Sequence, residues 1–245
     1  MSAKLYWQSV SHPSLAARKM LELKGVEFTL VDVLPLGQRV HLRLVGFRGG
    51  TVPALKLDGR RIQGSREIAR AVDEVWPDPP LLPSDPEPRA RVLEAEQWGE
   101  RVLQPVPRRL ARFGVARDRA FRQWWAERQS LPAPGVATTL SGPVAKYYAR
   151  TVEPGGRRAD EAGVRADLAE LPALLDRADA LLADGTLATD PPNAATLQVL
   201  SSARFLAAFQ DLRPYLERPT AAVARELFPD YPEPIPPFLP RDWLP

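Results

Sequence analysis

Serine hydroxyls are the first side chains in this sequence that could take part in chemistry: Ser9, Ser11 and Ser14 lie close together near the start of the chain. A positioned hydroxyl donates a hydrogen bond to an anion such as a thiolate, and that bond favours the thiolate over the thiol at neutral pH. Serine is also a common helix cap, because its side-chain oxygen accepts from main-chain N–H groups of the first turn. The three serines can therefore act as anion-stabilising donors or as caps.

Main-chain groups at two other segments form a second candidate. Thr51-Val52-Pro53 places a proline at the start of a short apolar strand, which indicates a constrained peptide bond before it. Gly64-Ser65 begins an amphipathic helix pattern. The first turn of a helix presents N–H groups and the positive end of the helix dipole, and these bind a carboxylate. Together the two segments favour a site for an acidic, peptide-like ligand.

Short strands and helices must position these groups. The pattern predicts strands at Lys4–Trp7, Phe28–Val33, Ala54–Leu57 and Arg60–Gln63, a helix after Ser11–Ser14 that is closed by Lys24-Gly25-Val26, and a helix with Ile68, Ala71, Val72 and Val75 on one face. Asp58-Gly59 between the last two strands is typical of a type I′ hairpin turn.

The rest of the chain predicts helices. A proline-dense stretch at residues 77–88 marks a boundary, because proline is excluded from helix and strand interiors. Helical periodicity resumes at Arg89 and is kinked or ended at Pro105 and Pro107. Further helices are expected over residues 158–183, over 194–209 with Asn193 as N-cap, and over 217–228. We expect a long surface loop at 130–145 and an extended, proline-rich tail over the surface at 229–245.

Composition limits the class of protein. The chain has no cysteine and only two histidines, His12 and His41. This excludes disulfides and cysteine-based or histidine-rich metal sites, so we expect no metal cofactor, and we place both histidines at the surface. No apolar run approaches the length of a membrane span, and the N-terminus carries no signal-peptide pattern. We therefore expect a cytoplasmic protein that does not bind a membrane.

Arginines and aromatic residues alternate over residues 108–128. A nucleic-acid-binding protein would use such arginines on phosphates and the aromatic rings on bases. An amphipathic helix pair would instead place the arginines in solvent and the rings in the core. Acidic residues interrupt the stretch and the formal net charge is only +3. These observations favour the helix pair, so no nucleic-acid partner is expected.

In order and spacing, residues 1–77 resemble the N-terminal domain of glutathione S-transferases. The resemblance is carried by Lys4-Leu5-Tyr6-Trp7, Ser11-His12-Pro13-Ser14, Lys24-Gly25-Val26, Gly49-Gly50-Thr51-Val52-Pro53-Ala54-Leu55 and Gly64-Ser65-x-x-Ile68. It implies an α/β plus all-α fold, with a thioredoxin-like thiol-binding N-terminal domain at 1–77, a linker at 78–88 and an all-helical C-terminal domain at 89–245. It also implies a cis Val52–Pro53 bond and a homodimer.

The resemblance implies that glutathione is the co-substrate and that Ser11 is catalytic. Ser11-His12-Pro13-Ser14-Leu15-Ala16 is similar to the Ser-x-Pro-Cys-x-Ala motif of theta-type enzymes, whose catalytic serine has the position of Ser11. Glutathione is then expected at Ser11, Thr51, Val52, Pro53, Gly64 and Ser65. The Val52 main chain would pair with its cysteinyl backbone, and Ser65 with the helix behind it would hold the γ-glutamyl carboxylate. Ser9 and Ser14 are expected to be caps.

Other catalytic types fit the sequence less well. Tyrosine-type members carry their phenol at the position of Trp7, and the neighbouring Tyr6 would face the other side of the strand. Cysteine-type members are excluded because there is no cysteine.

The implied function is a transferase that adds the thiolate of glutathione, or a related thiol, to an electrophilic small molecule in detoxification. The second substrate would lie against the helical domain, near Trp98, Val102 and Tyr147 or Tyr148. Two positions depart from the family: Gly64 replaces an acidic residue, and Thr196 replaces the aspartate of a capping element. They leave open a non-catalytic member of the same fold that binds ligands or a protein partner.

Overall fold

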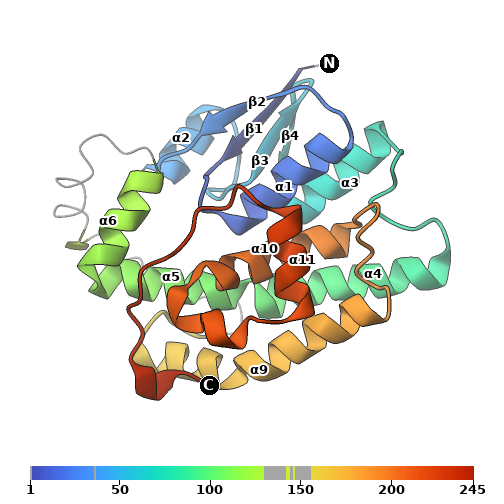
Figure 1. Cartoon of the computed structure of the whole chain (residues 1–245). Coiled ribbons are helices and arrows are strands. Elements are labelled where there is room, and N and C mark those ends of the chain that lie inside the picture. The colour runs from blue at the N-terminus through green and yellow to red at the C-terminus, as the bar shows by residue number, and fades with distance from the viewer. Residues whose placement is uncertain (1, 36, 130–141, 144–145, 147–155) are drawn as a thin grey trace.

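A small sheet lies at one end of the molecule and rests on a layer of helices (Figure 1). The structure, a computed structural model, describes residues 2–35, 37–129, 142–143, 146 and 156–245. Strands β1 (Ala3–Trp7), β2 (Phe28–Asp32), β3 (Ala54–Leu57) and β4 (Arg60–Gln63) form a four-stranded sheet in the order β2-β1-β3-β4. β1 and β2 are parallel, and the other two pairs are antiparallel. The thioredoxin-like mixed sheet expected from the sequence is confirmed.

The β3–β4 turn follows directly from its two residues. Asp58 and Gly59 have φ angles of 45° and 86°. A type I′ turn requires positive φ at both central positions, which Asp and Gly tolerate better than most residues. The hairpin predicted from Asp58-Gly59 is therefore confirmed.

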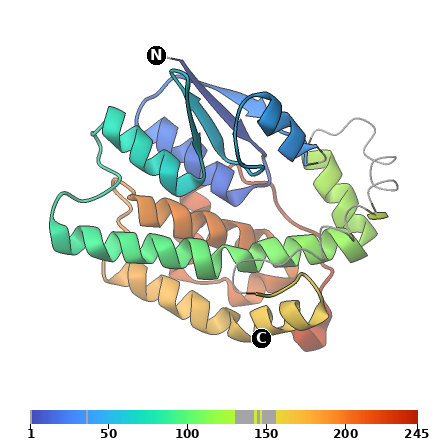
Figure 2. The ribbon, with the colours of Figure 1, turned by 180° about the vertical axis from the view of Figure 1, so that it is seen from behind.

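Helices cover both faces of the sheet, and strand alternation decides which side chains meet them. Helices α1 (His12–Leu23) and α3 (Ser65–Val75) lie between the sheet and the helical layer, whereas α2 (Gln38–Leu44) lies on the other side (Figure 2). Leu5 faces the larger core with α1 and α3, and Tyr6 faces a separate small core with Leu42 of α2. Successive strand residues point to opposite faces, as expected.

The second half of the described chain is helical. Its elements are α4 (Pro86–Trp98), a π-helical segment η1 (Gly99–Leu103), α5 (Pro105–Arg117), α6 (Arg119–Arg128), α9 (Glu161–Ala183), α10 (Ala194–Ala208), the short 3₁₀ helix η2 (Gln210–Tyr215), α11 (Pro219–Leu227) and the 3₁₀ turn η3 (Arg241–Trp243). Every residue of α10 is buried, so this helix forms the centre on which α1, α4 and α11 pack. The all-helical second domain expected from the sequence is confirmed.

Local capping explains how α10 begins. The Asn193 side chain accepts a hydrogen bond of 2.9 Å from the Thr196 N–H, which confirms Asn193 as the N-cap. The Thr196 hydroxyl donates to the Ala188 carbonyl, 2.6 Å away. Thr196 thus supports the preceding loop through a neutral bond, at the position where the resemblance implied an aspartate.

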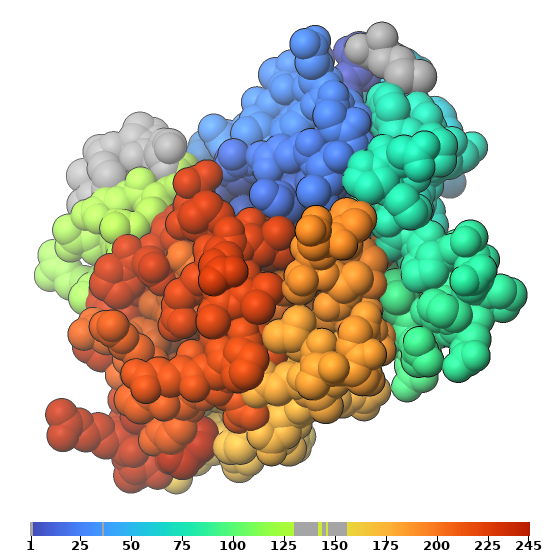
Figure 3. Space-filling view, turned by 45° about the vertical axis from the view of Figure 1, so that its right-hand side comes forward, coloured from blue at the N-terminus to red at the C-terminus, as the bar shows by residue number. Residues whose placement is uncertain are grey.

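Two expectations about proline-rich segments need correction. α4 begins at Pro86, earlier than Arg89, because proline is tolerated in the first turn of a helix, where its missing N–H has no partner to lose. The tail after residue 229 is largely extended, yet it does not only lie on the surface, since Tyr231, Ile235 and Leu239 are buried. In Figure 3 the red and orange C-terminal segments lie directly against the blue N-terminal part. The loop expected at 130–145 falls mostly outside the described residues.

The arginine-rich stretch forms α5 and α6, with Phe113, Phe121 and Trp124 in the core, as the amphipathic interpretation requires. Arg109 departs from that interpretation, because it is buried and paired with Asp167 instead of facing solvent. None of the helices in the described ranges is both long enough and apolar enough to cross a membrane.

Candidate functional site

Ser11 caps α1, and its hydroxyl can still donate a hydrogen bond. Its Oγ accepts from the Ser14 main-chain N–H at 3.4 Å and from the Ser14 hydroxyl at 3.0 Å. A serine hydroxyl has two acceptor lone pairs and one proton, so these bonds leave the proton available. No residue in the described part of the chain accepts that proton, and Ser11 is half-buried. Capping and donation to an anion are therefore compatible at this residue.

The other two serines are engaged. The Ser9 hydroxyl donates to the Arg128 carbonyl at the end of α6, 2.6 Å away. Ser14 is fully buried and its hydroxyl donates to Ser11. Ser9 therefore ties the β1–α1 loop to the helical domain, and Ser14 supports Ser11.

The segment before β3 presents unpaired main-chain groups. The Val52–Pro53 bond is cis, as expected. Gln63 holds the preceding turn in place: its Nε2 donates to the Thr51 carbonyl at 2.7 Å, and its Oε1 accepts from the Gly49 N–H at 2.9 Å. Within the described part of the chain, neither main-chain group of Val52 has a hydrogen-bond partner. An extended peptide lying beside Val52 would meet one free donor and one free acceptor.

Gly64 and Ser65 begin α3, but the Ser65 side chain faces inward. Gly64 has a φ of 97°, a conformation that side-chain-bearing residues rarely adopt. Ser65 is buried, and its hydroxyl donates to Oε1 of Gln198 on α10, 2.8 Å away. The first-turn N–H groups of α3 are thus the groups of this segment that can face an anion.

A chain of buried polar groups runs under the site. Gln198 accepts from Ser65, and its Nε2 donates to Oε1 of Gln104, at the junction of η1 and α5. The main chain of Gln104 also lies beside the His12 ring and favours its protonated form. This chain joins the N-terminus of α3 to that of α1 through the helical domain. Sequence reasoning missed Gln198 and Gln104, because nothing local to α10 or η1 marks them.

His12 is a core residue, which corrects the expectation that it lies at the surface. It is 2% exposed, and its ring lies 5.2 Å from that of Phe205. Burial lowers the pKa of its imidazole well below the usual value of 6.5, Arg108 lowers it further, and the Gln104 main chain opposes them. His12 is therefore neutral at physiological pH. Leu15 and Ala16, the residues one helical turn after His12, are buried on the same face of α1, so the helical spacing already indicated a core position for its ring.

The helical wall near the site is only partly described. Val102, in η1, is 41% exposed and is available to a ligand. Trp98 is buried, and the Arg177 guanidinium lies 4.9 Å from its ring, so it belongs to the core rather than to the surface of a cleft. Tyr147 and Tyr148 lie outside the described residues. No cluster of three metal-binding side chains occurs in the ranges the structure describes.

A hollow of about 500 Å³ occurs elsewhere, between the end of α10, η2, α11 and Glu233-Pro234. None of its lining residues belongs to the candidate site.

Known proteins share the fold and part of the sequence. Residues 10–75 match the family model described as glutathione S-transferase, N-terminal domain. A probable maleylacetoacetate isomerase 1 from Drosophila melanogaster is 30% identical over 96 residues, which are 39% of this chain and 39% of that protein. The matched stretch thus spans about two fifths of that curated relative.

Two solved structures extend the likeness over nearly the whole chain. A glutathione S-transferase from Rhodospirillum rubrum F11 has a TM-score of 0.64 at 20% identity, and the superposition covers 98% of this chain and 97% of that one. A maleylacetoacetate isomerase from Anaeromyxobacter dehalogenans 2CP-1, with dicarboxyethyl glutathione and citrate in its active site, has a TM-score of 0.52 at 22% identity, with 96% and 98% covered. At these identities the likeness is one of fold.

Proposed function

Since residues 10–75 belong to the glutathione S-transferase N-terminal domain family, we propose that this protein is a serine-type glutathione-dependent enzyme with Ser11 as its catalytic residue. The observation that carries the proposal is the half-buried Ser11 hydroxyl at the start of α1, whose proton has no acceptor in the described part of the chain. That proton is donated to the sulfur of bound glutathione. The bond favours the thiolate, which is the nucleophile at neutral pH.

Glutathione lies along the free main chain of Val52, between Thr51 and Pro53, with its cysteinyl backbone paired in antiparallel fashion. Its γ-glutamyl carboxylate is held by the first-turn N–H groups at Gly64 and Ser65. The Ser65 hydroxyl acts from behind, because its bond to Gln198 fixes the start of α3. This mode assigns Ser65 a main-chain contact rather than a side-chain contact with the ligand.

The thiolate adds to an electrophilic carbon of a small molecule. If the carbon belongs to a conjugated double bond, the electron pair moves onto the carbonyl oxygen as an enolate. Protonation of the enolate then gives a glutathione conjugate. The match to a curated maleylacetoacetate isomerase favours a second candidate reaction. In this reaction the adduct rotates about the carbon–carbon bond to which the thiolate added, and then expels the thiolate. That sequence returns glutathione and yields a cis–trans isomer.

The consumption of glutathione separates the two reactions. The purified protein is assayed with an activated aryl halide and, separately, with maleylacetoacetate. Conjugation consumes one thiol per turnover, whereas isomerisation consumes none. Calorimetry with glutathione alone tests the common first step. If millimolar glutathione releases or absorbs no heat and neither assay shows turnover, the non-catalytic alternative replaces the enzyme; the lack of a side-chain acceptor at Gly64 supports that alternative.

The proposal also includes the domain bounds, the cellular location and the oligomeric state of the protein. Residues 1–77 form the thiol-binding domain, 78–88 the linker, whose last three residues already belong to α4, and 89–245 the helical domain. The linker is held because the Asp73 carboxylate accepts from the Leu81 and Leu82 N–H groups, at 2.8 and 3.2 Å. The protein is a cytoplasmic homodimer.

A further inference from the structure

A tyrosine from the C-terminal tail contacts the loop that carries Ser11. The Tyr231 hydroxyl donates to the Val10 carbonyl, 2.9 Å away, although the two residues are 221 positions apart in the sequence. Val10 and Tyr231 are 1% and 2% exposed. The bond is therefore shielded from water, and the Val10 carbonyl has no other partner within the described ranges.

This bond completes the restraint on the peptide unit between Val10 and Ser11. The N–H of that unit, which belongs to Ser11, donates to the Gln8 carbonyl at 3.0 Å. Its C=O accepts from Tyr231. A peptide unit is planar, so bonding both of its polar ends fixes the orientation of the plane. The orientation of this plane sets the φ angle of Ser11 and thereby the direction of its side chain.

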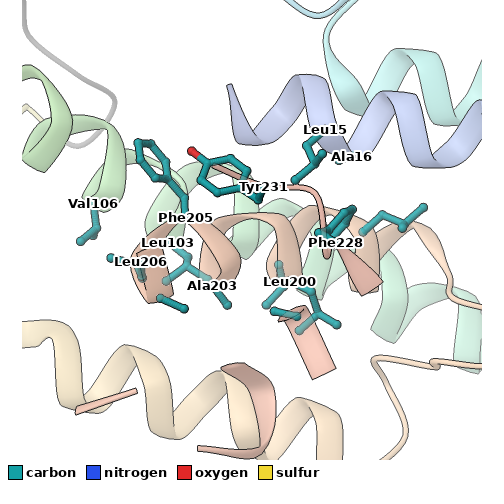
Figure 4. Close-up of a cluster of buried hydrophobic side chains, with 14 of the residues drawn as sticks. Leu15, Ala16, Leu103, Val106, Leu200, Ala203, Phe205, Leu206, Phe228 and Tyr231 are labelled. Carbon is teal, nitrogen blue, oxygen red and sulfur yellow. The ribbon is translucent and has the colours of Figure 1, made fainter. Parts of the chain in front are cut away.

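Tyr231 is itself held by a buried arginine. Arg204 of α10 is 1% exposed, and it donates to the Phe228 carbonyl at 2.9 Å, to the Tyr231 carbonyl at 3.1 Å and to the Glu233 carboxylate at 2.8 Å. These bonds clamp the chain on both sides of Tyr231. Its ring lies 5.5 Å from that of Phe205, between α10 and the Leu15–Ala16 side of α1 (Figure 4). The hydroxyl therefore has a defined position relative to the β1–α1 loop.

We propose that Tyr231 is a positioning residue for Ser11: its hydroxyl orients the Val10–Ser11 peptide so that the Ser11 hydroxyl is aimed at the bound sulfur. This inference rests on the proposed glutathione-dependent function. It goes beyond it by assigning part of the thiolate site to the C-terminal tail. Burial also raises the pKa of the Tyr231 phenol well above 10.0, so the hydroxyl keeps its proton and remains a donor.

The test is the Tyr231→Phe variant of the full chain, which removes only the hydroxyl. The pH titration of the ultraviolet absorbance of thiolate in the complex with glutathione gives the apparent pKa of the bound thiol. We expect that pKa to rise and kcat at mildly acidic pH to fall about 3- to 10-fold, the range for one lost hydrogen bond, with KM for glutathione changed less than about twofold. Tyr215→Phe is the matched control, because no described residue is bonded to the Tyr215 hydroxyl.

The results of these measurements distinguish a failure of the proposed function from a failure of the positioning role of Tyr231. If the wild-type protein binds no glutathione or leaves its thiol un-ionised, the proposed function fails. If the wild type ionises the thiol and Tyr231→Phe does so at the same pH, Tyr231 does not position Ser11, even where thermal unfolding shows a less stable variant. If Tyr231→Phe does not fold, Glu233→Gln loosens the clamp from a partly exposed position. A raised thiol pKa in that variant supports the role, and an unchanged one overturns it.

Discussion

Replacing Ser11 by alanine removes two kinds of interaction of different size: hydrogen bonds within the protein, and the proposed bond to the sulfur of glutathione. Within the protein, the buried Ser14 hydroxyl also loses its acceptor. As a cap, Ser11 accepts from the Ser14 N–H over 3.4 Å, a long bond, so its loss should cost about 0.5–1 kcal/mol of unfolding free energy. As a donor to a thiolate, Ser11 forms a charge-assisted bond that contributes about 1.5–3 kcal/mol. The second loss corresponds to a roughly 10- to 100-fold lower thiolate population at neutral pH.

Two quantities are measured: the rate at which glutathione is conjugated to a model electrophile, and the pKa of the thiol of enzyme-bound glutathione. We expect Ser11→Ala to raise that pKa by about 1–2 units and to lower kcat in proportion. Calorimetry should show little change in glutathione affinity, because Val52 and the α3 N-terminus contact the rest of the peptide. Thermal unfolding should show the small loss of the cap together with about 1–3 kcal/mol for the buried Ser14 hydroxyl, which is left without its acceptor.

Two neighbouring serines provide the controls. Ser14→Ala removes a fully buried hydroxyl that donates to Ser11. Its main effect should be a lower free energy of unfolding, with a smaller effect on kcat than that of Ser11→Ala. Ser9→Ala should loosen the contact with α6, since the Ser9 hydroxyl donates to the Arg128 carbonyl. If Ser11→Ala retains full activity while either control loses it, the assignment of Ser11 is wrong. If none of the three substitutions lowers the conjugation activity, the result favours the non-catalytic alternative.

Other predictions concern stability, binding and assembly. Ser65→Ala should lower the unfolding free energy by about 1–3 kcal/mol, because it leaves the buried Gln198 oxygen without a donor, yet it should weaken glutathione binding less than about tenfold; a loss of all binding measured by calorimetry would contradict the main-chain role of Ser65. Because the folded-state pKa of His12 lies below its unfolded value, the unfolded chain binds a proton first as pH falls. Stability from this group is present above about pH 6.5 and is lost below it, by up to about 1.4 kcal/mol per pH unit until the folded-state pKa is reached. Denaturant titrations from pH 7.5 to 5 should show this slope, and it should be absent in a folded His12→Gln variant. Light scattering at micromolar concentration should give the mass of a homodimer, and a monomer would refute the proposed assembly.

Sequence alone determined the elements whose causes are local. Asp58-Gly59 fixes the β3–β4 turn, because two adjacent residues with positive φ define it. Asn193 fixes the start of α10 through a bond to a residue three positions away. The alternation of Leu5 and Tyr6 assigned each to its face of the sheet. The same short-range reasoning placed Ser11 between β1 and α1, where it is found.

Only the tertiary structure decided where the polar side chains of the site point. Ser65 turns inward because Gln198, 133 positions away, offers it an acceptor in the core. His12 is buried because α1 packs on α10, and it is this contact between segments far apart in the sequence that brings its ring to within 5.2 Å of the Phe205 ring. Tyr231 reaches the Ser11 loop from a tail whose proline content indicated an extended surface segment. In each case the partner comes from a distant part of the chain, and a hydrogen bond between such groups exists only after packing has brought them together and removed water from around them.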